Sequence, residues 1–236
     1  MFAFSSTTSF AQSCSTDMNT IAASIQAAPL TKYMTLEASC DSLIQGPASL
    51  GFRLTGNTLP INNGIRSELA IDYPFKEGQT VRYSFDMKLP EYYVYDDAAN
   101  RWWSIAQWHD QPDRTKNETW STFAAHSPPV FLYIEQRFNR IVGMGLSTDS
   151  QRKHSWAAVP INTWLRISVT VKWSQGADGV VSVSVLDHPE FSDVIYGKNM
   201  FNGYQHYMKI GQYRRPEITS STNVLYRYVN ITTVTP

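Results

Sequence analysis

Trp164 to Trp173 reads WLRISVTVKW and Val180 to Leu186 reads VVSVSVL, and these two stretches decide the fold class. In both, β-branched residues alternate with polar ones, which is the period-two pattern of a half-buried β-strand. The residues between them, Ser-Gln-Gly-Ala-Asp-Gly, contain the glycines that a tight turn requires. The two stretches therefore predict an antiparallel hairpin.

Similar alternation recurs along most of the chain, whereas only one stretch looks helical. Asp17 to Ala27 is rich in alanine and begins with an aspartate suited to cap a helix. Together with the hairpin, the predicted strands are Leu50–Leu54, Ser67–Asp72, Val81–Leu89, Trp102–His109, Val130–Phe138, Tyr207–Arg214 and Val224–Val234. About ten short strands with turns between them predict an all-β fold: an antiparallel two-sheet sandwich of the β-jelly-roll kind, with one short N-terminal helix.

Composition limits the classes of function. Of the 236 residues, 42% are hydrophobic, which is enough for a sizeable core, and 13% are aromatic. Twenty Lys and Arg balance twenty Asp and Glu, so the basic excess typical of a nucleic-acid binder is missing. The sequence has no run of about 18 apolar residues, so it predicts no membrane-spanning helix. We expect one domain over residues 14–236, acting as a monomer without nucleic-acid or membrane partners.

The first residues and the cysteines bear on the cellular compartment. Residues 1–13 contain Ser9-Phe10-Ala11, which fits the end of a clipped secretion signal, and a disordered tail fits equally well. The only two cysteines, Cys14 and Cys40, lie in polar, serine-rich surroundings, and we expect a disulfide rather than two buried thiols. These features favour a secreted or periplasmic protein.

Three predicted strands carry polar side chains on one face, because residues i, i+2 and i+4 of a strand share a face. Arg66 and Glu68 share a face in the first, and Gln107 and His109 share a face in the second. The third places Tyr207, Lys209, Gly211 and Tyr213 on one face, and the glycine suggests an open spot for a ligand close to the backbone. Each pattern alone also fits an ordinary solvated strand, but together they suit an anionic sugar.

Other chemistries are less well supported. The sequence has no Gly-x-Ser-x-Gly elbow, no phosphate-binding loop and no Cys-x-x-Cys or His-x-x-x-His pair. We therefore predict no catalytic metal and no required cofactor, while a structural Ca²⁺ held by carbonyl groups would leave no trace in the sequence. Paired carboxylates for glycoside hydrolysis are not ruled out, although no strand has two acids at i and i+2.

The three strands resemble motifs of the jelly-roll polysaccharide lyases. Arg66 to Leu69 (RSEL), Gln107 to His109 (QWH) and Tyr207 to Arg214 (YMKIGQYR) follow the order and rough spacing of that clan. The tryptophan between Gln and His, and the Arg after the last Tyr, resemble the glucuronan lyases of polysaccharide lyase family 20 and the heparin lyase I group. The alginate lyases of this architecture are more distant. The resemblance covers residues 66 to 214.

The resemblance implies a groove on one sheet and β-elimination at a uronic acid. It implies that His109 and Tyr213 form the catalytic pair and that Arg66 and Gln107 neutralise the substrate carboxylate. Lys209 matches a position that contacts substrate, and Glu68, Arg214, Arg137 and Tyr207 are further candidates for substrate contact. A cation such as Lys209 or Arg214 near Tyr213 would lower its pKa and favour the base form.

The resemblance implies a lyase that cleaves β-1,4-glucuronan in endo mode, and two alternatives stay open. An alginate lyase acting on polymannuronate fits the same motifs. A non-catalytic sugar-binding module on the same fold would need only the many aromatic residues, several of which crowd Tyr92 to Trp103. That segment, extended to Thr119, is also a candidate loop over the groove. We expect His126 and His206 to be structural or solvated.

Overall fold

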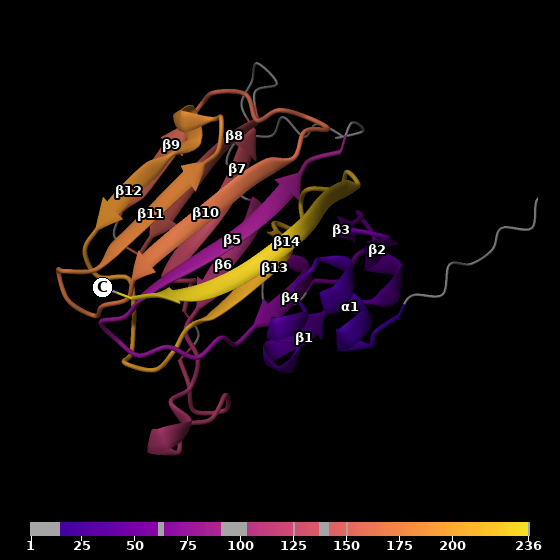
Figure 1. Ribbon diagram of the computed structural model, residues 1–236. Helices are drawn as coiled ribbons and strands as arrows, with labels where there is room; N and C mark the ends of the chain where they lie inside the picture. The colour runs from indigo at the N-terminus through magenta and orange to yellow at the C-terminus, as the bar shows by residue number, and fades with distance from the viewer. Residues whose placement is uncertain are drawn as a thin grey trace, which may run out of the picture.

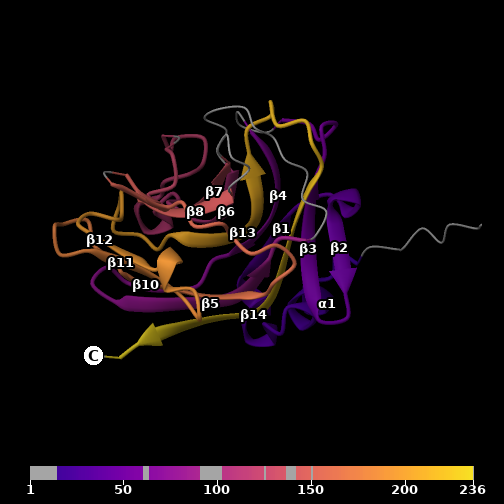
Figure 2. The same ribbon diagram turned by 90° about the horizontal axis from the view of Figure 1, so that it is seen from above.

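The computed structural model describes residues 15–60, 64–90, 103–124, 126–136, 142–149 and 151–235. Two seven-stranded antiparallel sheets stack face to face (Figures 1 and 2). The first has the order β1 (Met34–Glu37), β4 (Ile65–Ile71), β13 (Tyr207–Arg214), β6 (Trp103–His109), β7 (Val130–Gln136), β8 (Val142–Thr148), β9 (Arg152–Ser155). The second has the order β12 (Asp193–Tyr196), β11 (Val180–Val185), β10 (Leu165–Lys172), β5 (Thr80–Lys88), β14 (Thr222–Val234), β3 (Ser49–Leu54), β2 (Leu43–Gly46). The predicted jelly-roll class is confirmed.

The hairpin that decides the fold class forms as predicted. β10 and β11 pair antiparallel with Val169 opposite Val183. Ile167, Val169 and Val171 are fully buried, whereas the residues between them are partly exposed. The alternation of the sequence therefore sends one face of the hairpin into the core between the sheets, and β5 and β12 extend the sheet on either side.

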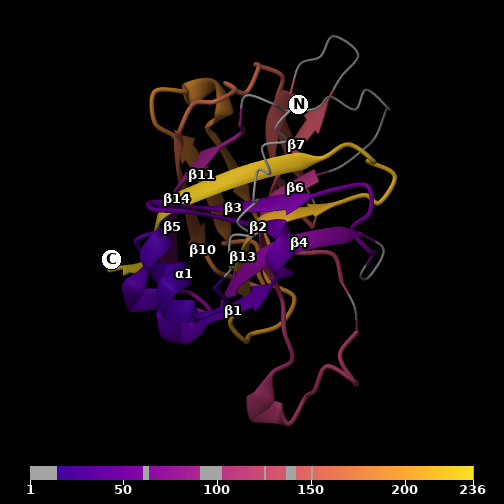
Figure 3. The same cartoon turned by 90° about the vertical axis from the view of Figure 1, so that its right-hand side faces the viewer.

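The N-terminal helix is also present, but it is shorter than predicted. α1 spans Met18–Ser24, and the Asp17 carboxylate accepts a hydrogen bond from the backbone N–H of Thr20 at 3.0 Å. It ends early because Gln26 adopts a left-handed φ of 55°. A 3₁₀ turn, η1 (Ala28–Tyr33), then leads into β1. α1 packs against β1, β2 and β3 (Figure 3).

The sequence prediction missed several strands, since the described residues form fourteen rather than about ten. β1, β2, β9 and β12 have only four residues each, too few to show a clear alternation. β8 contains Gly143 and Gly145, and glycine is disfavoured in strands because it has no side chain to pack. Short 3₁₀ turns η2 (Cys40–Ser42), η3 (Arg114–Lys116) and η4 (Pro189–Phe191) complete the elements.

β13 lies between β4 and β6, and its side chains alternate between the two faces of the first sheet. Met208 and Ile210 are buried in the core, and the Gln212 amide donates hydrogen bonds to the carbonyls of Phe52 and Thr222 on the second sheet. Tyr207, Lys209 and Tyr213 must therefore point to the opposite face, away from the second sheet. We call this outer face of the first sheet the site face.

A β-bulge interrupts the pairing of β13 with β6 between Ile210 and Tyr213. Gly211 has a φ of +133°, and a Cβ atom there would lie 2.3 Å from the carbonyl oxygen of Ser67. The hydroxyl of buried Tyr226 lies 2.6 Å from the carbonyl oxygen of Ile105 and 3.0 Å from that of Gly211. The prediction that Gly211 leaves space for a ligand is wrong, because the backbone bulge itself requires the glycine.

Two further observations concern the compartment. Cys40 is disulfide-bonded, as expected, and its expected partner Cys14 lies outside the described residues. Among the described residues, no helix has both the length and the apolar character needed to cross a membrane.

The bulge predicts a difference between two glycine substitutions. Gly78 also has a positive φ, of 86°, but nothing lies within 4 Å of its added Cβ. Gly78→Ala should therefore cost about 1 kcal/mol of unfolding free energy from backbone strain alone. Gly211→Ala should cost about 3 kcal/mol or more, since it adds a backbone clash. Urea unfolding of both variants measures the difference, and equal costs would contradict the role given to the bulge.

Candidate functional site

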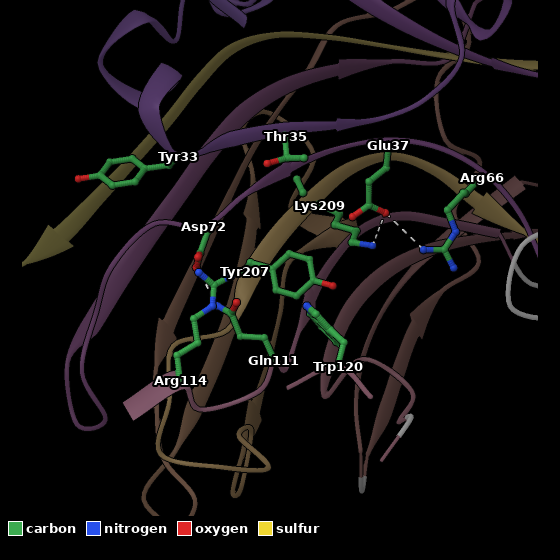
Figure 4. Close-up of a pocket in the computed structure, with 11 residues that line it drawn as sticks. Tyr33, Thr35, Glu37, Arg66, Asp72, Gln111, Arg114, Trp120, Tyr207 and Lys209 are labelled. Atoms are coloured by element: carbon green, nitrogen blue, oxygen red, sulfur yellow. Dashed lines mark hydrogen bonds and ion pairs between the residues drawn. The ribbon is translucent and has the colours of Figure 1, made fainter. Parts of the chain in front are cut away.

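Four side chains form a network of ion pairs on the site face, and we call Glu37, Arg66, Glu68 and Lys209 the ion-pair centre (Figure 4). The Oε2 atom of Glu37 lies 2.6 Å from Nζ of Lys209 and 3.4 Å from a terminal nitrogen of Arg66. Glu68 lies 3.8 Å from Arg66 and 3.9 Å from Lys209. The strand register explains the cluster, because Glu37 pairs with Glu68 across β1 and β4, and Gly211 pairs with Glu68 across β4 and β13.

Glu68 is the buried member of the centre. Its Oε1 atom accepts a hydrogen bond from the Gln107 amide, which reaches it from β6 on the other side of β13. Burial raises the pKa of the Glu68 carboxyl to about 6, although Lys209 and Arg66 act in the opposite direction. Both Glu68 and Gln107 are only 2% exposed, and Glu68, fixed by Gln107, lies below the two cations.

Tyr213 lies at one end of the ion-pair centre, beside Arg66. The Arg66 guanidinium carbon is 4.5 Å from the centre of the Tyr213 ring. Gly64 makes room for this ring, because a Cβ atom there would lie 2.2 Å from Cε2 of Tyr213. Burial raises the pKa of Tyr213, and the Arg66 charge only partly offsets it. The expectation of a lowered pKa is therefore wrong, and the raised pKa favours the neutral phenol at Tyr213.

His109 lies at the other end and is oriented by Asp110. Its Nδ1 atom is 2.9 Å from the carbonyl oxygen of Asp110 and 2.9 Å from one carboxylate oxygen of the same residue. A carbonyl oxygen only accepts, so Nδ1 carries the proton in the neutral ring, and Nε2 keeps a lone pair. His109 also stacks on Tyr207, with ring centres 5.9 Å apart. The arrangement provides a base at Nε2.

Asp110 holds a second histidine from the following loop. It is fully buried, and its other carboxylate oxygen is 2.7 Å from Nδ1 of His126. Burial opposes ionisation, but hydrogen bonds from His109 and His126, together with the charge of His109, outweigh it and lower the pKa of Asp110. His126, expected to be structural or solvated, is thus held in place by a buried carboxylate. His206, in contrast, is a core residue whose pKa burial lowers to about 4.

His109 and Tyr213 flank the ion-pair centre rather than meeting. His109 pairs with Tyr207, and Tyr213 lies six residues further along β13. At about 3.3 Å per residue, with the bulge in between, the two backbones are roughly 15–20 Å apart. Their side chains can therefore approach a bound group from opposite ends, with Lys209 and Arg66 between them.

A pocket of about 580 Å³ opens on the site face at the β1 edge. Ion-pair residues Glu37, Arg66 and Lys209 line it together with Tyr207 (Figure 4). Further lining comes from η1, β1, the end of β4 and the β6–β7 connection: Tyr33, Thr35, Ala70, Asp72, Gln111, Arg114 and Trp120. That connection extends beyond the sandwich at one end (Figure 3). Tyr92–Thr119 was predicted as a loop over the groove. Of its described residues, 103–109 form β6 instead, and the rest belong to the connection that contributes Gln111 and Arg114 to the pocket.

Trp120 and Arg114 of the β6–β7 connection bring an aromatic ring and a cation to the pocket. Trp120 is 57% exposed, and its ring meets the Tyr207 ring edge to face at 6.3 Å between centres. An exposed indole beside a polar pocket is a surface on which a sugar ring can stack. Arg114 is exposed, and within the described part of the chain it has no carboxylate partner at ion-pair distance. Arg114 thus offers the pocket a guanidinium whose hydrogen-bond donors are not taken up by a carboxylate of the described residues.

A comparison with protein families identifies the chain. A family model described as polysaccharide lyase matches residues 23–228. The chain belongs to this family. No curated protein matches the lyase.

Several solved structures share the fold of the lyase. An endo-β-1,4-glucuronan lyase from the fungus Trichoderma reesei is 14% identical with a TM-score of 0.59, over 85% of this chain and 87% of that one. A family 7 alginate lyase, A1-II′, solved with substrate, is 11% identical with a TM-score of 0.57, over 83% and 82%. A GH131 β-glucanase catalytic domain from Podospora anserina is 15% identical with a TM-score of 0.52, over 88% and 82%. Because a hydrolase shares the fold, the fold alone does not define the reaction.

Two of the candidate substrate contacts need comment. Arg214 points into the interior, where its guanidinium donates to the Thr222 hydroxyl at 2.8 Å and to the Ser220 carbonyl at 2.8 Å. It is fully buried, so the prediction that it contacts substrate is wrong. The cause is strand alternation, which places Arg214 on the face opposite Tyr213. Arg137 lies outside the described residues.

Several residues of the lyase site were missed by sequence reasoning. Glu37 lies on a four-residue strand with no recognisable motif, and Arg114 and Trp120 come from an irregular connection. Asp110 directly follows His109, and that adjacency was the one available signal. The Arg152 guanidinium of β9, likewise missed, lies 4.6 Å from the centre of the Tyr133 ring on β7.

The raised pKa of Glu68 predicts a pH-dependent stability. Because the folded pKa of about 6 exceeds the ordinary 4.5, this carboxyl stabilises the fold below pH 4.5 and loses that contribution as pH rises through 6. Glu68→Gln removes the titration. Relative to the variant, the wild type should lose about 2 kcal/mol of unfolding free energy between about pH 4 and pH 7. Urea unfolding at both pH values tests this, and a constant difference would show that Glu68 does not titrate as described.

Proposed function

We propose that the lyase cleaves a uronic-acid polymer by β-elimination and that its substrate is an endo-cleaved β-1,4-glucuronan. The observation that carries the proposal is the ion-pair centre, which lies between an oriented histidine and a tyrosine on one sheet face. Arg66 and Lys209 can bind a sugar carboxylate, and His109 and Tyr213 can reach the same sugar from its two ends. The resemblance of the QWH and YMKIGQYR strands to glucuronan lyases supports the choice of polymer, as does the fold shared with the Trichoderma reesei enzyme.

The reaction follows from these groups. A base removes the proton on C5, the electron pair forms the C4–C5 double bond, and the glycosidic oxygen leaves C4 with a proton from an acid. One chain gains an unsaturated uronate end and the other a new reducing end, and no water or cofactor is consumed. Donors from Arg66, Lys209 and, once the substrate is bound, Gln107 would stabilise charge that flows into the carboxylate. Tyr213 would supply the leaving-group proton from its phenol.

The identity of the base depends on the sugar. In glucuronate, the C5 proton and O4 lie on the same side of the ring, so a single Tyr213 serves as base and then as acid. That role needs the tyrosinate, and because the pKa of Tyr213 is raised, the rate should increase toward alkaline pH. The Arg66 charge beside the ring favours the proton loss.

Alginate is the second candidate, and the geometry of His109 favours it. In the neutral ring its Nε2 lone pair is free to act as a base, because Asp110 holds the proton on Nδ1. In guluronate, the C5 proton and O4 lie on opposite sides of the ring, which suits a base and an acid at opposite ends of the sugar. Polymannuronate would use Tyr213 alone, as glucuronan does. The alginate lyase A1-II′ shares the fold.

A polymeric substrate also fits the rest of the sheet. Arg152 is held over the Tyr133 ring three strands from β6, which is about 14 Å at the usual strand spacing. A chain that crosses the site face would meet this cation several sugars from the ion-pair centre. A polymer of this kind is met outside the cell, and the disulfide at Cys40 supports a secreted or periplasmic enzyme. We further propose that the enzyme acts as a monomer.

Separate Tyr213→Phe and His109→Ala variants test the assignment. On glucuronan, the wild type should generate the ultraviolet absorbance of the double bond conjugated to the carboxylate. Tyr213→Phe should lower kcat at least about 100-fold because it removes the proton carrier. His109→Ala should act less strongly on glucuronan than on polyguluronate, where it removes the base.

Matched controls are available on the same fold. Tyr196 of β12 is 64% exposed, and His188 pairs with Glu190 outside the pocket. Tyr196→Phe and His188→Ala should leave turnover unchanged. Near-wild-type turnover of both site variants would overturn the assignment, and polymer binding without any product would favour a sugar-binding module.

A further inference from the structure

Glu37 occupies an unusual position in the ion-pair centre. It lies on β1, the edge strand, and its side chain is 31% exposed, whereas those of Lys209 and Arg66 are 4% and 13% exposed. Figure 4 shows its carboxylate between the Lys209 ammonium and the Arg66 guanidinium, facing the pocket. The group that covers the two cations on the pocket side is thus itself a carboxylate.

The charges of the centre balance only while Glu37 is in place. Two cations face two carboxylates, Glu68 from below and Glu37 from the pocket. Glu68 is buried and hydrogen-bonded to Gln107, so it has no route away from the cations. Glu37 can swing toward solvent, because its side chain is flexible and partly exposed. A third carboxylate beside the two cations would face repulsion from Glu37 if Glu37 stayed.

We propose that Glu37 is a resident competitor, which occupies the position of a sugar carboxylate and is displaced when a uronate binds. This inference rests on the proposed function for the class of ligand, a β-1,4-linked uronate chain. Each bound uronate must exchange with Glu37 at Lys209 and Arg66, so the enzyme binds its substrate less tightly than the two cations alone would allow. The exchange keeps the cations ordered when no substrate is present.

A positioning role for Glu37 would predict the opposite change in uronate affinity. If Glu37 only positions Arg66 and Lys209 for the substrate, removing its charge weakens binding of uronates. If Glu37 competes, removing its charge strengthens it. Glu37→Gln keeps the shape and one acceptor oxygen, and Glu37→Ala removes the side chain altogether.

The experiment is a calorimetric titration on the Tyr213→Phe background, which is expected not to cleave its ligand. The probes are a glucuronan tetrasaccharide and cellotetraose, which has the same β-1,4-linked backbone without carboxylates. Glu37→Gln and Glu37→Ala should both bind the glucuronan tetrasaccharide about fivefold more tightly, the scale of one partly exposed ion pair. Binding of cellotetraose should not change.

Glu190→Gln is the matched control, since it makes the same charge change in η4, outside the pocket. It should leave both affinities unchanged. Unchanged or weaker uronate binding in both Glu37 variants would overturn the competitor role.

The outcome separates this inference from the proposed function. Tighter uronate binding in the Glu37 variants, with no unsaturated product from the wild type, would sustain the competitor and overturn the lyase reaction proposed for this polymer. Product from the wild type with unchanged affinity in the variants would overturn the competitor alone. A parallel gain for cellotetraose would also overturn it, because the effect would then not depend on the carboxylate.

Discussion

The buried carboxylate of Glu68 is the interaction on which the site depends. A carboxylate that is almost fully buried is tolerated because Gln107 donates to it and two cations lie close to it. Each of these partners comes from a different strand, so the carboxylate ties β4, β13 and β6 together at one level of the sheet. In return, Arg66 and Lys209 are held in fixed orientations under a pocket, where an incoming anion meets them already arranged.

The backbone supports that arrangement from the core side. The bulge at Gly211 changes the register between β13 and β6, and the Tyr226 hydroxyl lies against a carbonyl of each strand. As a result, Lys209 faces Gln107 on one side of the bulge, while Tyr213 faces Ser104 on the other. The bulge therefore helps to set the distance between the two catalytic candidates, His109 and Tyr213.

Strand alternation explains how much the sequence could predict. It correctly placed Lys209 and Tyr213 on one face and Trp108 on the other, because the period of two survives in long strands. The same rule, applied to Arg214, would have excluded it from the site, and only the family resemblance suggested otherwise. The sequence could not reveal Glu37 or Trp120, because their positions depend on which distant segments become neighbours. Nor could the sequence give the direction of the Tyr213 pKa shift. That direction depends on whether burial, which raises the pKa, outweighs the charge of Arg66, which lowers it.

We expect the site face to catalyse elimination across the C4–C5 bond of a uronate held at the ion-pair centre. The most direct measurement is the ultraviolet absorbance produced by the wild type from a panel of glucuronan, polymannuronate, polyguluronate, hyaluronan and heparin. The account predicts a rise with glucuronan, a faster rise at alkaline pH, and little or none with densely sulfated heparin, because the pocket lacks a broad excess of cations. Reducing ends released from any of these polymers without the absorbance would mean hydrolysis, and would contradict the account.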